Sequence, residues 1–296
     1  MSILKTLCFI TSHPLNEGRE IAALCRFAKW QLSSRMAPGA VVVDWISGTK
    51  LLVRNGETGL TGNIYTGLHE FIDMAYVLHL LRKADVFADV GANAGSYSIL
   101  ACGAVGARGF AFEPVPATHA RLVENLRLNC IEECVDHPQI GIGKESGIIR
   151  FTTDGDTVNH VLAEGEVTVD AVDVEVLTLD EALGASEPML LKIDVEGFEM
   201  PVLMGASRVL NSSALNSVII ELNGSGSRYG FDESLILELM FDYGFRSYAY
   251  DPFTRSLDDL AGESSDSGNT LFIRDLQLAK ARVQSARGFR VNGREI

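Results

Sequence analysis

The sequence predicts an α/β protein built on a doubly wound, largely parallel sheet. Short apolar runs alternate with helical patterns from about residue 85 onward. One of these runs, residues 86–90, ends in a glycine turn over residues 91–95 that leads into an apolar helical stretch. A second run ends in Glu113, roughly twenty residues past the turn, which is the spacing of ribose-binding acids in nucleotide-binding folds. We therefore expect a ligand at the carboxyl ends of these strands.

The sequence predicts that residues 1–84 form an N-terminal α+β extension, which acts as a lid or wall and is not a domain of its own. The opening run, 3–10, is too short to span a bilayer and lacks a secretory cleavage pattern, so we expect a strand or a helix edge there. The remaining patterns of the extension predict, in order, a helix over 15–36, a hairpin of 41–45 with 50–53, a glycine-punctuated loop over 56–67 and a helix over 69–82.

Residues 85–275 predict the ligand-binding domain, with strands inserted at about 146–179. The expected strands are 86–90, 108–113, 135–142, 147–151, 167–169, 172–176, 189–194, 218–222, 245–250 and 270–273. The expected helices are 96–105, 117–129, a stretch reaching about 210, and 233–243. Because an acidic loop without a helix joins the last two strands, they predict a final antiparallel pair. The tail, 276–296, leans basic and predicts a solvated surface segment, with a dimer contact as the alternative.

Composition restricts the partners. The 296 residues carry 25 Lys plus Arg against 39 Asp plus Glu, and the net charge of -14 repels phosphate backbones and anionic lipids. We therefore expect neither nucleic acid nor a membrane as a partner. The five cysteines are odd in number and form no C-x-x-C, which is typical of reduced thiols and predicts a cytoplasmic protein.

The glycine turn indicates which ligand the first strand binds. The turn reads Gly91, Ala92, Asn93, Ala94, Gly95 and offers G-x-x-x-G, not the G-x-G-x-x-G of dinucleotide sites. Asp89 beside the turn would repel a pyrophosphate but suits a ligand with cationic groups, and S-adenosylmethionine carries a sulfonium and an ammonium. Glu113 can accept both ribose hydroxyl protons. A nicotinamide-dependent oxidoreductase and a purely structural turn are the alternatives.

A second charged motif follows a later strand. Residues 191–199 place Lys192 and the acids Asp194, Glu196 and Glu199 where a strand gives way to a helix. Because ligands of open α/β sheets bind outside the carboxyl strand ends, Asp194 is expected to share a rim with the acids of the first two strands. For Glu199 we prefer a structural interpretation, a favourable position at the helix N-terminus.

These motifs together resemble the FkbM-type S-adenosylmethionine-dependent methyltransferases. The motifs that carry the resemblance are residues 89–95, 111–114, 191–199 with 202–206, and 269–273. The resemblance implies a class I methyltransferase fold, a Rossmann-like sheet of seven strands whose last strand is antiparallel. It also implies O-methylation of a sugar, glycan or glycosylated metabolite. The implied roles are the methionine part of the cofactor for Asp89, Gly91 and Gly95, its ribose for Glu113, and the neighbourhood of the reactive methyl for Asp194.

A hydroxyl acceptor needs a base, because it is a poor nucleophile until its proton is leaving. The candidates are Asp194, Glu196 and His160, the last in a polar loop at 157–160. A further set that could face the acceptor is His69, Glu70 and Asp73.

Two further alternatives remain open. Asp194, Glu221 and Asn223 follow neighbouring strands, and such oxygen ligands suit Mg²⁺. Zinc has no support, because closely spaced His or Cys ligands are missing from the sequence. A non-catalytic domain that keeps the fold for binding or for assembly is the other alternative.

Overall fold

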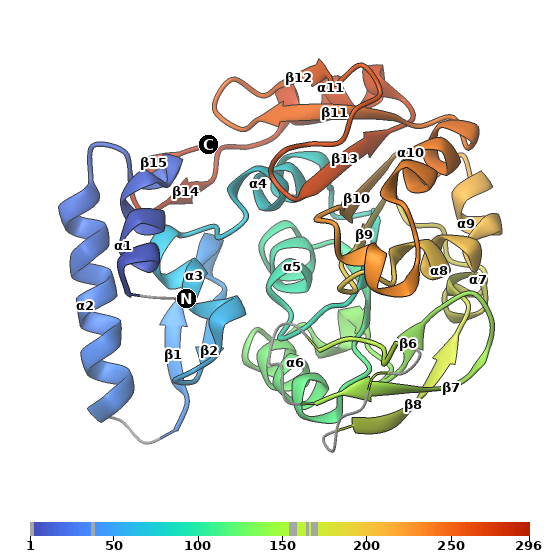
Figure 1. The fold of residues 1–296 in the computed structure, drawn as a ribbon. Helices are drawn as coiled ribbons and strands as arrows, with labels where there is room; N and C mark the ends of the chain where they lie inside the picture. The colour runs from blue at the N-terminus through green and yellow to red at the C-terminus, as the bar shows by residue number, and fades with distance from the viewer. Residues whose placement is uncertain (1–2, 37–38, 154–158, 164–165, 167–170) are drawn as a thin grey trace.

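The computed structural model describes residues 3–36, 39–153, 159–163, 166 and 171–296, and its centre is a mainly parallel sheet (Figure 1). In spatial order its eight strands are β12 (Ser256–Asp259), β11 (Arg246–Asp251), β13 (Asn269–Ile273), β10 (Ser217–Glu221), β9 (Leu190–Ile193), β3 (Val86–Val90), β4 (Arg108–Phe112) and β5 (Val135–Asp136). The strands β10, β9, β3, β4 and β5 are parallel, while β13 is antiparallel to both of its neighbours. The expected doubly wound sheet with an antiparallel strand near its end is confirmed.

Helices cover both faces of the sheet because successive strand residues point to opposite sides. Leu190 and Ile219 belong to one hydrophobic cluster, and the next residues, Leu191 and Ile220, belong to the other. The first face carries α4 (Phe71–Leu80), α5 (Ser96–Ser98) with a π-helical continuation (Ile99–Val105), α6 (Pro116–Leu128) and α11 (Leu276–Ser285). The second face carries α7 (Leu179–Leu183), α8 (Glu199–Met204), α9 (Ser207–Asn211) and α10 (Glu233–Asp242).

The N-terminal extension lies beside the first face (Figure 1). It consists of α1 (Ile3–Ser12), a 3₁₀ turn (Pro14–Asn16), α2 (Glu20–Met36), the hairpin of β1 (Val41–Asp44) with β2 (Lys50–Val53), and α3 (Thr58–Thr66). The opening run is thus a full helix, and the loop expected over 56–67 is wrong. Packing overrides the weak helix propensity of its Gly and Thr residues, because Leu60 and Tyr65 are buried and Arg26 Nη2 donates to the Tyr65 carbonyl at 2.9 Å.

A three-stranded sheet follows β5, the edge strand of the main sheet. It consists of β6 (Gly141–Ile142), β8 (Ala171–Leu177) and β7 (Gly147–Thr152). The single strand expected over 135–142 is wrong: the chain leaves the main sheet after Asp136 and re-pairs in the small sheet. Pro138, which has no N–H for a ladder, lies between the two pairings. The strand expected over 167–169 lies outside the described residues.

Three expectations at the C-terminal end need correction. The sheet has eight strands instead of seven, because a turn after Asp251 folds the chain back as β12. The helix expected to reach about 210 is divided into α8 and α9 at Gly205. The tail is not a solvated segment: α11 packs on α4, and the hairpin of β14 (Arg290–Val291) with β15 (Arg294–Glu295) buries Val291 and Ile296.

Among the described residues, no helix combines the length and the apolar character that crossing a bilayer requires.

Candidate functional site

The glycine turn passes directly under the end of β9. Gly91 has a φ of +82°, and a Cβ at this position would lie 1.8 Å from the backbone oxygen of Asp194. The amides of Gly91 and Ala92 both donate to the Phe112 carbonyl at 3.0 Å. The ends of β3, β4 and β9 therefore meet at one point, and only glycine allows the approach.

Glu113, the expected ribose ligand, closes this turn. Its Oε2 accepts the Asn93 amide and its Oε1 the Val115 amide, each at 3.0 Å. Asn93 has a φ of +50°, which is uncommon for a residue with a Cβ. Burial raises the pKa of Glu113 to about 7. The carboxylate therefore shapes the cradle, and its contact with a ribose stays a prediction.

Asp89 lies beneath the turn and is 1% exposed. Ser98 Oγ donates to Asp89 Oδ2 at 2.7 Å, which ties β3 to the start of α5. Burial raises the pKa of Asp89 to about 6, and the nearby Lys192 opposes this shift. In this conformation the Asp89 carboxyl supports the turn, and its action on a ligand stays a prediction.

The residue that the sequence left without a role is Lys192. Its Nζ lies 2.6 Å from Asp194 Oδ2 and 4.5 Å from the centre of the Tyr97 ring, and its side chain is buried. Burial alone would lower the pKa of Lys192, but Asp194, Glu70 and Asp89 raise it above its usual value. The site thus holds a buried ammonium clamped to the carboxylate expected near the reactive methyl.

The extension contributes acids to the same site at the start of α4. Asn269 Nδ2, at the start of β13, donates to Asp73 Oδ2 at 3.0 Å and to Glu70 Oε1 at 3.2 Å. Burial raises the pKa of Asp73 to about 7. The third member of the expected set, His69, is directed elsewhere: its ring packs edge-on against Phe9 at 5.0 Å.

On the other side of Asp194 lie Glu196 and Glu221. Carboxylate oxygens of these three residues lie within 4.8 Å of one another. The pKa of Glu196 is raised to about 6 and that of Glu221 to about 9. Burial is the largest cause in both cases, and the charge of Asp194 is the next. Of the expected magnesium ligands, Asp194 and Glu221 are together, but Asn223 is exposed and its Oδ1 accepts the Ser225 amide at 2.9 Å. Glu196 takes the third position of this acidic group.

The two remaining sequence candidates differ in their placement. His160 Nε2 lies 2.9 Å from Glu166 Oε1, and His160 is among the groups that influence the pKa of Glu196, which places it at the rim of the site. Residues 157 and 158 of its loop lie outside the described residues. Glu199 Oε1 accepts the amides of Val195 and Gly197 at 3.2 and 3.1 Å, so this acid has a structural contact, but with the turn before α8 and not with the helix N-terminus.

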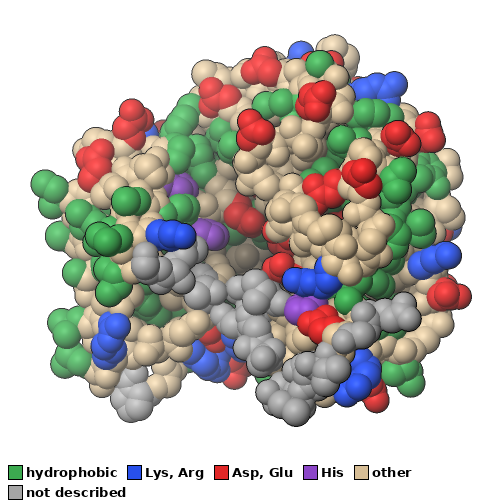
Figure 2. Space-filling model, in the orientation of Figure 1, with side chains coloured by type: hydrophobic (Ala, Val, Ile, Leu, Met, Phe, Trp, Pro, Cys, Tyr) green, Lys and Arg blue, Asp and Glu red, His purple; other side chains and the backbone are tan. Residues whose placement is uncertain are grey.

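The site as a whole carries a surplus of acids. Around the ammonium of Lys192 lie the carboxyl groups of Glu70, Asp73, Asp89, Asp194, Glu196 and Glu221. Figure 2 shows a hollow near the centre of the drawn face, with acidic side chains beside it. Such a surplus is costly without a cation nearby, so the arrangement suits a positively charged ligand.

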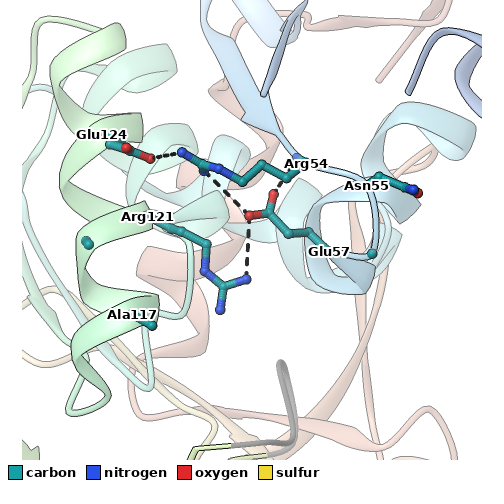
Figure 3. Close-up of a pocket in the computed structure, with 8 residues that line it drawn as sticks. Arg54, Asn55, Glu57, Ala117, Arg121 and Glu124 are labelled. Atoms are coloured by element: carbon teal, nitrogen blue, oxygen red, sulfur yellow. Dashed lines mark hydrogen bonds and ion pairs between the residues drawn. The ribbon is translucent and has the colours of Figure 1, made fainter. Parts of the chain in front are cut away.

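A second cavity, of about 580 Å³, lies between the extension and α6 (Figure 3). Arg54 Nη2 lies 2.6 Å from Glu124 Oε2, and both Arg54 and Arg121 approach Glu57 Oε1, at 3.6 and 3.5 Å. Because two arginines balance two glutamates, this cavity lacks the negative surplus of the strand-end site. These pairs attach the extension to α6.

The sheet order, the antiparallel β13 and the glycine turn define a Rossmann-like fold of the class I methyltransferase type. The family model described as "Methyltransferase FkbM domain" matches residues 89–247, more than half of the chain. The chain therefore belongs to the FkbM methyltransferase family.

Three known proteins are similar to this chain. The hexuronic acid methyltransferase AglP of Haloferax volcanii is 34% identical over 150 residues, covering 50% of this chain and 59% of AglP. Methyltransferase 1 of Beauveria bassiana is 26% identical over 190 residues, covering 56% of this chain and 76% of that protein. A crystal structure of methyltransferase FkbM from Methylobacillus flagellatus aligns with a TM-score of 0.45 at 16% identity, covering 72% of this chain and 52% of the other.

Proposed function

We propose that this protein transfers a methyl group from S-adenosylmethionine to a hydroxyl of a sugar, glycan or glycosylated metabolite. One observation carries the proposal: in a member of the FkbM methyltransferase family, six carboxyl groups surround a single buried lysine beside the glycine turn. A cationic methyl donor balances this surplus, whereas a dinucleotide phosphate would increase the repulsion. The net charge of -14 also favours a small-molecule or glycan acceptor over nucleic acid.

The residues at the strand ends fit such a donor. Because Gly91 has no Cβ, the backbone of the turn packs directly against the Asp194 carbonyl, which brings the turn and the end of β9 to one point. Glu113 follows β4 beside the turn, where a ribose would lie. When bound, the donor supplies a methyl group on a sulfonium, whose positive charge disappears during the transfer. The acids near Asp194 thus stabilise the bound donor, and we assign the acceleration mainly to alignment of the acceptor hydroxyl.

Among the candidate bases, the geometry favours Glu196. The Lys192 ammonium lies 2.6 Å from Asp194 Oδ2, so one oxygen of this carboxylate is already engaged in an ion pair. Glu196 lies beside it, and its raised pKa, about 6, is closer to neutral pH. As the acceptor oxygen forms its bond to the methyl carbon, the bond to sulfur breaks and the hydroxyl proton passes to Glu196. His160 at the rim can then exchange that proton with solvent.

The sugar class of acceptor rests on the relatives. AglP is named for a hexuronic acid, and its similarity to this chain covers about half of each protein. The acids at the reacting centre favour an acceptor that presents a neutral hydroxyl there and any carboxylate of its own farther away.

Calorimetry with S-adenosylhomocysteine tests the donor site, and transfer of an isotope-labelled methyl group to a cell extract identifies the acceptor by mass spectrometry. We expect binding of S-adenosylhomocysteine and a labelled saccharide. 5′-Methylthioadenosine, which lacks the ammonium, serves as a matched ligand and should bind at least tenfold more weakly. Absence of binding by both ligands would contradict the proposal, and binding without any labelled product would favour a non-catalytic domain. Binding of reduced nicotinamide cofactor would support the oxidoreductase alternative.

A further inference from the structure

The outer face of α2 exposes a stripe of apolar side chains. Ile21, Leu32 and Met36 are 80%, 63% and 74% exposed, although most large apolar side chains of the chain are buried. Cys25 and Ala28 between them are exposed as well. At 100° per residue these five positions fall within an arc of about 80°. They therefore form one continuous stripe, which we call the α2 stripe.

Exposed apolar side chains also lie at the start of the neighbouring helix. Ile3 and Leu4 at the start of α1 are also exposed, and α1 packs along α2. Figure 2 shows hydrophobic side chains gathered along the edge of the molecule where Figure 1 places α1 and α2. Contiguous exposed apolar surface of this kind is typical of an interaction site.

The α2 stripe is complementary to itself. When two α2 helices pack antiparallel about a twofold axis near residue 26, Ile21 of each copy lies opposite Leu32 of the other. The small residues Cys25 and Ala28 then face each other near the axis, where they let the helices approach closely. Lys29 lies at the edge of the stripe, where its chain reaches solvent.

We infer that the α2 stripe is the interface of a homodimer, formed by antiparallel packing of α2 against α2 of a second copy. Closed twofold dimers need such a self-complementary patch. The 17 residues of α2 span about 25 Å, so the helix pair with the start of α1 buries close to the lower limit, about 1,000 Å², of specific interfaces. The dimer should therefore dissociate in the micromolar range. The inference does not depend on the proposed function.

Sedimentation velocity of the full chain from 1 to 100 μM tests the dimer. We expect a monomer–dimer equilibrium for the natural sequence and at least a tenfold weaker dimer for Leu32→Glu. Ile148→Glu is the matched control, because Ile148 is equally exposed but lies on β7. Circular dichroism checks that both variants fold. A monomer at every concentration, or equal weakening by both substitutions, would overturn the inference; in the first case a membrane or another protein would be the occupant of the stripe.

Cysteine cross-linking tests the antiparallel arrangement. In a background with the exposed Cys8, Cys25, Cys130 and Cys134 replaced by serine, Ile21→Cys combined with Leu32→Cys should give a covalent dimer under mild oxidation. Either substitution alone should not, because identical positions of the two copies lie about 16 Å apart in this register. The two cysteines of one chain are separated by the same distance and cannot bond to each other. Cross-linking by a single substitution, or none by the pair, would contradict the proposed packing.

Discussion

The Nζ of Lys192 lies 2.6 Å from Oδ2 of Asp194, inside a group of six carboxyl groups contributed by four regions of the chain. Lys192 and Asp194 are two residues apart at the end of one strand, and the ammonium of their ion pair is buried. The pair orients Asp194 and offsets part of the surrounding negative charge. The site therefore holds one cation of its own, the Lys192 ammonium, and enough carboxyl groups for the second cation that a bound donor would bring.

Replacing Lys192 by methionine should destabilise the fold and raise its sensitivity to pH. Removing one partner of a buried ion pair costs about 3 kcal/mol, because the other charge is left uncompensated. We expect this loss at pH 8 and a smaller loss at pH 5, where Asp73 and Asp89, with pKa values of about 7 and 6, become protonated. Chemical denaturation at both pH values measures it. Lys144→Met, at an exposed position, is the control, and an equal loss at both pH values would argue against this electrostatic account.

Asp194→Asn should separate donor binding from turnover. The amide keeps the shape of the side chain but loses the charge, and the expected place of Asp194 is beside the reactive methyl. We expect methyl transfer to fall roughly 100-fold or more, and affinity for S-adenosylhomocysteine, which has no sulfonium, to fall less than tenfold. Single-turnover kinetics and calorimetry measure the two effects. Equal loss of both would reduce Asp194 to a structural residue.

Gly91→Ala should abolish donor binding and destabilise the fold. A Cβ at this position would lie 1.8 Å from the Asp194 oxygen, so β9 or the turn must move. Gly224→Ala is a matched control, because Gly224 has a similar φ, +87°, but a Cβ there meets nothing within 4 Å. We expect the control to cost about 1 kcal/mol from backbone strain and the Gly91 variant at least about 2 kcal/mol more. Thermal unfolding and calorimetry compare them, and equal losses would mean that the close approach is unimportant.

Local sequence patterns were sufficient for the parts of the site that lie within one strand–turn–helix unit. The turn at Gly91 and the charged end of β9 could be placed at one rim because parallel strands end at the same edge of a sheet. The positions of Asp194 and Glu221 beside each other follow from this rule. Glu199 is a structural residue, but its Oε1 accepts the amides of Val195 and Gly197 in the turn before α8, and burial raises its pKa to about 7. Attraction to the helix N-terminus therefore does not explain its place.

Contacts between distant segments could not be predicted in this way. Asp73 reaches the site through Asn269, which is 196 residues away in the sequence. The role of Lys192 depends on Tyr97 and on the acids of α4, which no spacing rule connects with β9. The helix α3 and the buried tail were missed for a related reason: their stability comes from packing against other segments, not from local propensity.

Magnesium should have no effect on the folded protein. The acidic group of Asp194, Glu196 and Glu221 offers oxygen ligands, but the Lys192 ammonium already occupies one side of Asp194. We expect the melting temperature and the affinity for S-adenosylhomocysteine to be the same in excess EDTA and in 5 mM MgCl₂. Sodium chloride at equal ionic strength controls for general charge screening. A rise in melting temperature of several degrees that is specific to magnesium would show that the acids hold the ion.

Without a bound donor, the stability of the protein should fall as the pH rises from 5 to 9. The pKa values of Glu196 and Glu221 are raised in the folded state to about 6 and about 9, from 4.5. A carboxyl group whose pKa is raised by folding contributes stability below its unfolded pKa, and this contribution is lost as the pH passes the folded value.

Glu221→Gln should therefore be more stable than the natural sequence at pH 9 and nearly equal to it at pH 5. Thermal unfolding across this range measures the difference, with the exposed Glu175→Gln as control. Saturating S-adenosylmethionine should reduce the advantage of the variant, because its cationic groups compensate the ionised acids. If the variant were instead less stable at pH 9, the neighbours of Glu221 would stabilise its ionised carboxylate by more than burial destabilises it.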